Sequence, residues 1–134
     1  MDTELKKSQD LREGLAGFYG SEQLFSHMDK PFSLHYTEGV RCFAENCGGG
    51  AYWFLDIVST ELANLMRTEE FLVVTLDVYD HTWATDYKGA QAEIVVTDGN
   101  EERLYSKRLS YTDAPQGKWK FYLQNNTLYL PTEH

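Results

Sequence analysis

The chain has 134 residues, of which 42% are hydrophobic and 14% aromatic. This length suits one domain with its own core, and the aromatic content excludes an intrinsically disordered chain. No apolar run approaches the roughly 18 residues of a membrane-spanning helix, and charged residues 1–7 lack the apolar core of a signal peptide. We therefore expect a single cytoplasmic domain over residues 1–134 with no membrane association.

The net charge is −9, from 21 acidic and 12 basic side chains. Such a surface repels phosphate backbones, because duplex binding rests on neutralisation of phosphates by Lys and Arg. Direct binding of nucleic acid is therefore not expected. Two interpretations of the acidity stay open: it keeps a small protein soluble, or it lets the protein compete for a basic, DNA-handling groove of another protein.

The first part of the chain predicts two helices. Leucines spaced among charged residues indicate a peripheral helix over residues 3–16. Ser21 can cap a second, short helix, in which Leu24, Phe25 and Met28 would face inward.

Residues 32–36 are extended and predict a short edge strand. Thr37 then offers a cap for a helix that ends at the glycine run 48–50. A further helix over residues 51–67 is apolar almost all round in its first two turns, so it should be central and largely buried.

From residue 71 the hydrophobic period changes to two, which predicts strands. We expect them over residues 71–80, 90–97, 103–111, 118–124 and 127–130. Asp98-Gly99-Asn100 and Asn125-Asn126 are suited to the tight turns between them, because these residues tolerate positive φ.

Helices followed by strands predict an α+β fold. The helical part, about residues 3–67, would pack on one face of a C-terminal antiparallel meander of about five strands, residues 71–131. The far face would carry both signs of charge together with tyrosines: Asp77, Tyr79, Glu93, Lys120 and Tyr122. This face is either simply solvated or a partner surface, since exposed aromatic residues are enriched at interfaces.

Several short sequences resemble an uncharacterised family of small proteins from bacteria, phages and plasmids. They are FYGSEQ (18–23), YTEGV (36–40), GGAYWFLD (49–56), DGN (98–100), YTDAP (111–115) and LYLPTE (128–133). The resemblance spans nearly the whole chain from Leu11. It departs at Ala114, where a bulky apolar residue is expected, and at His134, where an aromatic is expected. It implies a mobile-element context and no catalytic activity.

The glycine run 48–50 precedes a helix, as phosphate-binding loops do. No Lys-Ser or Lys-Thr follows it, so the P-loop pattern fails, and the glycines can equally end one helix and start the next. If a ligand pocket exists here, its candidate residues are Tyr36, Glu38, Gly49, Gly50 and Asp56.

Asp56 lies between Leu55 and Ile57 in the most apolar part of the chain, where an unpaired carboxylate is costly. It can pair with Arg41, cap a backbone group or point along a cleft. A structural ion pair is the favoured interpretation, because buried charges are normally paired.

The sequence contains no motif typical of a metal site or of an activated nucleophile. His27, His35 and His81 could join Glu38 or Asp80 as metal ligands, but no His-Glu-x-x-His motif or paired-histidine helix occurs. The two cysteines, Cys42 and Cys47, are expected to be reduced thiols with at least one in the core. We therefore expect no metal, no cofactor and no catalytic residues.

Two functions remain from the sequence. The first is a non-enzymatic acidic interaction protein of a phage, plasmid or other mobile element, which binds a host or element-encoded protein and in one version inhibits a defence system. The second is a small-molecule or nucleotide-binding domain, in one version a hydrolase, with a pocket near the helix start at Gly48–Gly50. A homodimer through an edge strand or the tyrosine-bearing sheet face is also open.

Overall fold

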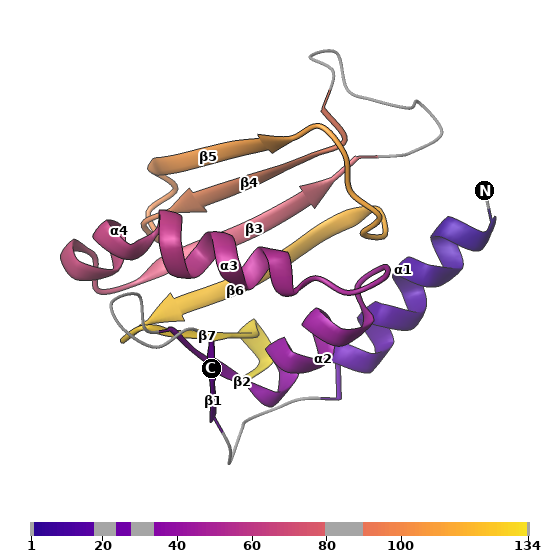
Figure 1. Cartoon of the computed structure of the whole chain (residues 1–134), viewed down its shortest axis with the longest axis horizontal. Coiled ribbons are helices and arrows are strands. Elements are labelled where there is room, and N and C mark those ends of the chain that lie inside the picture. Colours follow the sequence, from indigo (N-terminus) through magenta and orange to yellow (C-terminus); the bar gives the residue numbers. More distant parts are fainter. Residues whose placement is uncertain (1, 18–23, 28–33, 80–89, 134) are drawn as a thin grey trace.

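The computed structural model describes residues 2–17, 24–27, 34–79 and 90–133 (Figure 1). Within these ranges the helices are α1 (Asp2–Leu15), α2 (Glu38–Asn46), α3 (Tyr52–Glu61), α4 (Ala63–Thr68) and the 3₁₀ helix η2 (Pro131–Glu133). The strands are β1 (Leu24–His27), β2 (Leu34–Thr37), β3 (Leu72–Val78), β4 (Ala92–Thr97), β5 (Arg103–Leu109), β6 (Gly117–Gln124) and β7 (Thr127–Tyr129). The predicted α+β class is confirmed. None of these helices is both long and apolar enough to cross a bilayer.

The seven strands form one sheet in the order β1-β2-β7-β6-β3-β4-β5. β3, β4 and β5 make an antiparallel meander, but β6 pairs with the other side of β3, so β3 lies between β6 and β4. β7 returns beside β6, and β2 joins β7 in the parallel direction. The prediction of a meander of about five strands was therefore too simple, because it missed β1, did not place the predicted strand β2 in this sheet, and missed the crossover between β5 and β6.

The short helix predicted from Ser21 is wrong where the structure describes it. Leu24–His27 is strand β1, which pairs antiparallel with β2 from Leu24 opposite Thr37 to His27 opposite Leu34. A four-residue segment is too short for its own periodicity to decide between helix and strand, so pairing with a neighbour decides it. Ser21 and Met28 lie outside the described residues. β2 is a strand, as predicted, but β1 occupies the edge position.

One face of the sheet builds the core. The alternating residues Leu72, Val74, Leu76 and Val78 of β3 are buried, as are Trp119, Phe121 and Leu123 of β6. Phe121 meets Phe43 of α2 and Phe54 of α3, with ring centroids 4.8 and 5.0 Å away. The inward positions of β3, β4 and β6 are thus those that the period of two predicts.

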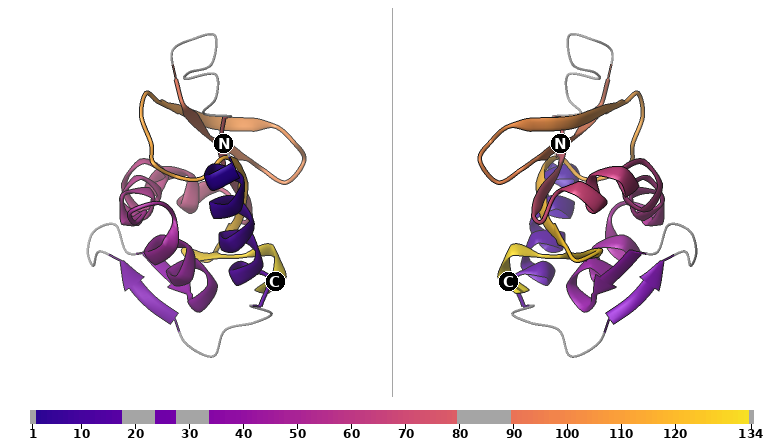
Figure 2. Two further views of the ribbon diagram at one scale, coloured as in Figure 1. Left: turned by 90° about the vertical axis from the view of Figure 1, so that its right-hand side faces the viewer. Right: turned by 90° about the vertical axis from the view of Figure 1, so that its left-hand side faces the viewer.

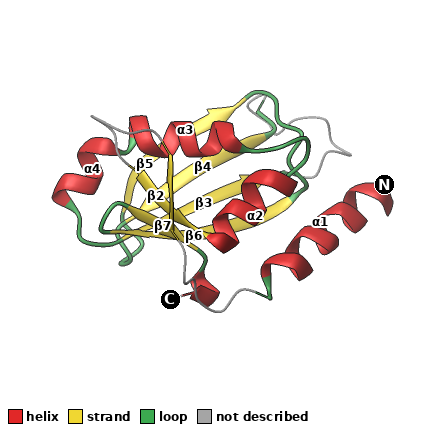
Figure 3. Cartoon of the chain, turned by 60° about the horizontal axis from the view of Figure 1, so that its bottom comes forward, coloured by secondary structure: helices red, strands yellow, loops and turns green. Residues whose placement is uncertain are grey.

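Helices α2, α3 and α4 lie on this side of the sheet (Figure 2). Helix α1 stands beside the start of β6 (Figures 1 and 3), where Ser8 Oγ donates to the Gln116 carbonyl at 2.7 Å. The Arg12 guanidinium lies 4.5 Å from the centre of the Trp119 ring. Packing of all helices on one face is therefore right for α2–α4, whereas α1 flanks the sheet.

The helix predicted over residues 51–67 is interrupted at Leu62, which separates α3 from α4. In the turn before the interruption, the hydroxyls of Ser59 and Thr60 both donate to the Asp56 carbonyl, at 3.1 and 2.7 Å. Such hydroxyl bonds to a helix carbonyl often bend a helix. α3 buries Phe54, Leu55 and Val58, but Tyr52 and Asp56 are exposed, so its first two turns are less buried than predicted.

Candidate functional site

The outer face of the sheet carries the residues that were predicted as an interaction surface. The strand register aligns Lys118, Asp77, Glu93 and Arg108 across β6, β3, β4 and β5. The next row consists of Lys120, Thr75, Val95 and Ser106. In the part of the chain that the structure describes, no helix lies over this face (Figure 2).

A hollow of about 390 Å³ lies on this face. Its charged lining consists of Asp77, Glu93, Arg103, Lys118 and Lys120, joined by Thr75 and Val95. Three of the five predicted surface residues thus line one concavity. Tyr122 lies on the row beyond Lys120, where its ring packs 5.7 Å from that of Tyr129, and half-buried Tyr79 directly follows β3.

Asp77 and Glu93 face each other directly across β3 and β4. Like charges in this position repel and destabilise a sheet. Burial raises the pKa of the Asp77 carboxyl above its ordinary value; Lys118 opposes the rise and Glu93 adds to it. Glu93 is within 3.6 Å of the Arg103 guanidinium. The hollow therefore keeps two carboxylates together although burial disfavours the ionised form of Asp77.

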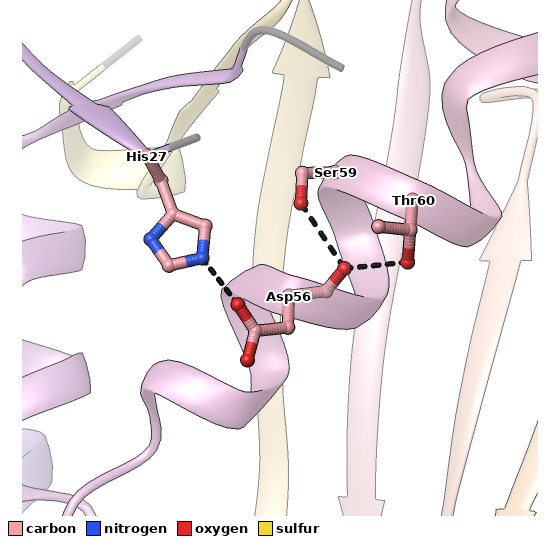
Figure 4. Close-up of polar contacts among 4 residues, drawn as sticks. All are labelled: His27, Asp56, Ser59 and Thr60. Carbon is pink, nitrogen blue, oxygen red and sulfur yellow. Dashed lines mark hydrogen bonds and ion pairs between the residues drawn. The ribbon is translucent and has the colours of Figure 1, made fainter. Parts of the chain in front are cut away.

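Tyr36 and Asp56, from the predicted ligand pocket, are brought together through His27 and Tyr52. The His27 Nε2 lies 2.6 Å from Asp56 Oδ1 (Figure 4), and the His27 ring stacks against Tyr52 at 6.3 Å. The Asp56 side chain is 63% exposed, against 17% for His27. The prediction of a carboxylate in the apolar core was therefore wrong: Asp56 lies on the exposed side of α3.

Arg41 does not pair with Asp56 but forms an ion pair with Glu45 at 3.1 Å. Tyr36 is buried, and burial together with the neighbouring Tyr52 raises the pKa of its hydroxyl. This hydroxyl therefore stays protonated at neutral pH and serves as a hydrogen-bonding group. Glu38, the remaining acidic candidate, begins α2, where the helix dipole favours a carboxylate.

The glycine run lies elsewhere and is engaged by the chain itself. The Gly49 N–H donates to Asp113 Oδ2 at 2.8 Å, and the Gly50 N–H donates to the Cys47 carbonyl. Gly48 has φ +60°, and a Cβ there would meet the Asp113 backbone oxygen at 2.4 Å. The run therefore serves a turn and a close approach that only glycine permits. It joins two of the sequences that carry the family resemblance, GGAYWFLD and YTDAP.

Glu133 joins another two of these sequences, YTEGV and LYLPTE. Its carboxylate accepts hydrogen bonds from Thr37 Oγ1 at 2.6 Å, from the Leu130 N–H at 3.0 Å and from the Gly39 N–H at 3.2 Å. Thr37 in turn caps α2 by accepting from the Val40 N–H. The cap at Thr37 was predicted, but its support from the other end of the chain was not.

Both cysteines are free thiols, and Cys47 is buried, as expected. Burial, with a smaller contribution from Asp113, raises the pKa of Cys47 to about 12, so it is not a nucleophile at neutral pH. Among the described residues, no three His, Cys, Asp or Glu side chains gather as a metal site would require. His81 and Asp80, two residues of the metal hypothesis, lie outside the described ranges.

Sequence reasoning missed several residues of these clusters. Arg103 joins the hollow because of a register shift between β4 and β5, which no local pattern reveals. His27 meets Asp56 because β1 is a strand, and Asp113 meets Gly49 across 64 positions of sequence.

A family model described as a family of unknown function, DUF6876, matches residues 9–134. No match was found among the curated proteins, and none among the solved structures. The matched range includes every contact described above except those of Ser8. The chain therefore belongs to the family of unknown function DUF6876.

Proposed function

We propose that the protein is a non-enzymatic interaction protein, carried by a phage, plasmid or other mobile element, which binds a host or element-encoded protein. The observation that carries the proposal is the charged hollow on the uncovered sheet face. The mobile-element context rests on the sequence resemblance alone. Inhibition of a host defence system is the version that the acidity of the chain suggests.

The hollow has the character of a recognition surface. It presents two carboxylates and three cations within one concavity, and Tyr122 on the neighbouring row adds an aromatic ring. Complementary charges across an interface steer association and select the partner. Asp77 and Glu93 face each other at a cost to the sheet, which is the arrangement expected of residues kept for binding rather than for stability.

The test is capture of a partner from lysate of a bacterial host by the tagged protein, compared between two matched variants. The first variant, Asp77→Asn/Glu93→Gln, removes both carboxylates of the hollow. The second, Asp10→Asn/Glu13→Gln, removes one Asp and one Glu from the exposed surface of α1. Both change the net charge from −9 to −7, because each loses two negative charges.

We expect the wild-type protein and the α1 variant to retain the same partner, and the hollow variant to lose it by at least tenfold. Equal retention by all three proteins would show that the hollow is not the docking surface. Capture of nothing above background would contradict an interaction protein altogether.

A small-molecule or nucleotide-binding role is the second candidate. An apolar hollow of about 330 Å³ lies beside the glycine run, lined by Gly49, Gly50, Trp53, Tyr111 and Asp113 together with Leu109 and Thr112. Its size suits a small ligand, but the Asp113 carboxylate already accepts the Gly49 N–H that an anion would use. A thermal-shift screen of nucleotides and metal ions tests this candidate, since a tight ligand must raise the melting temperature.

A further inference from the structure

Strand β6 is only partly covered along one of its two edges. It pairs with β3 over Gly117 to Leu123, but with β7 only over Tyr122 to Gln124. Pairing of β7 with β6 ends at Tyr129, and after Leu130 the chain continues as η2, which contacts β6 without pairing with it as a strand. In the part of the chain that the structure describes, no strand therefore pairs with this edge along the first half of β6, although α1 and η2 flank it.

The hydrogen-bond pattern identifies the open backbone groups. Gln124 and Thr127 flank the two-residue turn, so the backbone N–H and C=O groups of Gln124 point toward β7. Because this direction alternates along a strand, the backbone groups of Tyr122, Lys120 and Lys118 point to the same side of β6. An independent bond agrees: Tyr79 N–H donates to the Gln91 carbonyl, which assigns the odd-numbered positions of β3 to β4. The N–H and C=O groups of Lys118 and Lys120 thus point to this edge.

An apolar groove of about 230 Å³ runs beside these groups. Besides its cations, it is lined by Leu15 of α1 and the following Ala16, by Trp119 and Phe121 of β6, and by Leu130, Pro131 and Thr132 at the C-terminal end of the chain. Its cations are Arg12, Lys118 and Lys120. Three cations around one apolar groove stand out on a chain with a net charge of −9.

We propose that this edge of β6 accepts an extended segment of a partner protein, which adds as an antiparallel strand and alternates acidic with apolar side chains. The inference deepens the proposed function, because it names the chemistry of a partner segment, but it stands on β6 and α1 rather than on the carboxylates of the hollow. Strand addition of this kind draws affinity from main-chain bonds and specificity from alternate side chains.

The alternation of the segment follows from the geometry of β6. Residues of an added strand opposite Lys118 and Lys120 share their face, where acidic side chains complement the ammonium groups. Residues opposite Trp119 and Phe121 point into the groove, which favours apolar side chains. The remote negative charge of the chain opposes binding only weakly, since screening at physiological salt acts over about 8 Å.

Lysines on an edge strand also have a purely protective role, because charged side chains discourage unwanted pairing. The protective role and the docking role predict different results when an added strand is offered. A protective edge rejects every added strand, whereas a docking edge accepts an acidic segment and rejects a basic one.

The test uses two blocked peptides, Glu-Val-Glu-Val-Glu and Lys-Val-Lys-Val-Lys, titrated into the full-length protein and followed by amide chemical shifts and hydrogen exchange. We expect only the acidic peptide to bind and to slow exchange of the Lys118 and Lys120 amides by tenfold or more. Methylation of the Glu amide nitrogens should abolish binding, and methylation of the Val amide nitrogens should not, because only the former face β6 in an antiparallel pair.

A charge swap supplies the matched control. Lys118→Glu/Lys120→Glu should exchange the preference, so that this variant binds the basic peptide, whereas Lys6→Glu/Lys7→Glu on the exposed face of α1 should keep the preference for the acidic one. Three results would overturn the proposal: no binding of either peptide, equal binding of both, or amides of Lys118 and Lys120 already protected in the free protein by self-association. The experiment needs no natural partner, so its failure and that of the lysate capture are distinguishable.

Discussion

The two faces of the same strands differ in what they do for the protein. On the inner face, Leu72, Val74 and Leu76 of β3 are fully or almost fully buried against helices and contribute hydrophobic stability. On the outer face the intervening Asp77 meets Glu93, a like-charge pair that opposes folding. One strand thus carries both the core and the outer surface that we propose for binding, and the two faces should differ in what they contribute to stability.

The largest expected effect belongs to the inner face. Phe121→Ala removes the ring that contacts Phe43 and Phe54, and should lower the free energy of unfolding by about 3–5 kcal/mol. Urea denaturation followed by circular dichroism measures the change. On the outer face of the paired strand, Thr75→Ala should change stability by no more than about 0.5 kcal/mol. Similar losses for the two variants would contradict the assignment of the faces.

The contact between the two ends of the chain should have the next largest effect. Glu133→Gln leaves an amide nitrogen where an oxygen now accepts from the Gly39 N–H or the Thr37 hydroxyl. We expect a loss of about 1–2 kcal/mol, as for the loss of a helix cap. Denaturation of this variant beside the exposed control Glu70→Gln measures it. An unchanged midpoint would show that Glu133 does not stabilise α2.

A smaller effect of opposite sign is expected on the outer face. Burial raises the pKa of Asp77 in the folded protein. The contribution of Asp77 to the free energy of unfolding is therefore most favourable below the ordinary pKa of an aspartate, and it is lost as pH rises through the raised pKa. Asp77→Asn should therefore stabilise the protein at neutral pH, by up to about 1 kcal/mol. The gain should vanish at acid pH, where the carboxyl is protonated in both states. Denaturation across a pH series checks this, and a loss at neutral pH would refute the assignment.

The smallest effect concerns a bridge between α3 and β5. The Tyr105 hydroxyl donates to the Glu61 carboxylate, and this bond, together with Lys107, lowers the pKa of Glu61. A lowered carboxyl pKa gives stability that is present above the ordinary value and lost as pH falls through the lowered one. Tyr105→Phe should cost about 0.5–1 kcal/mol at neutral pH and less in acid. A loss that does not depend on pH would indicate lost packing instead.

The regular part of the fold could be predicted because it obeys local rules. The alternation of Leu72, Val74 and Leu76 identifies β3, and Asn125 and Asn126 both adopt positive φ, +54° and +57°, in the predicted hairpin turn. Thr37 caps α2 as its side chain suggests. These features depend on neighbours within a few residues.

The features that failed depend on distant partners. β1 is a strand because β2 is beside it, and β6 joins β3 through a crossover that no turn residue signals. Asp56 was placed in the core because Leu55 and Ile57 flank it, but on a helix the flanking residues point in other directions. The predicted surface residues share a face because side chains alternate between the two faces of a strand. The place of Arg103 in the hollow depends on the strand register, and the groove beside β6 depends on the position of α1, so neither could be predicted from local sequence.

We propose that the outer-face carboxylates of Asp77 and Glu93 are kept for binding at a cost to stability. The free energy of unfolding of Asp77→Asn/Glu93→Gln at neutral pH, relative to the charge-matched Asp10→Asn/Glu13→Gln, tests this most directly, because both variants relieve the same net charge. We predict that the hollow variant is the more stable of the two by up to about 1 kcal/mol. A hollow variant less stable than its control would contradict the account, since the two carboxylates would then hold the sheet together.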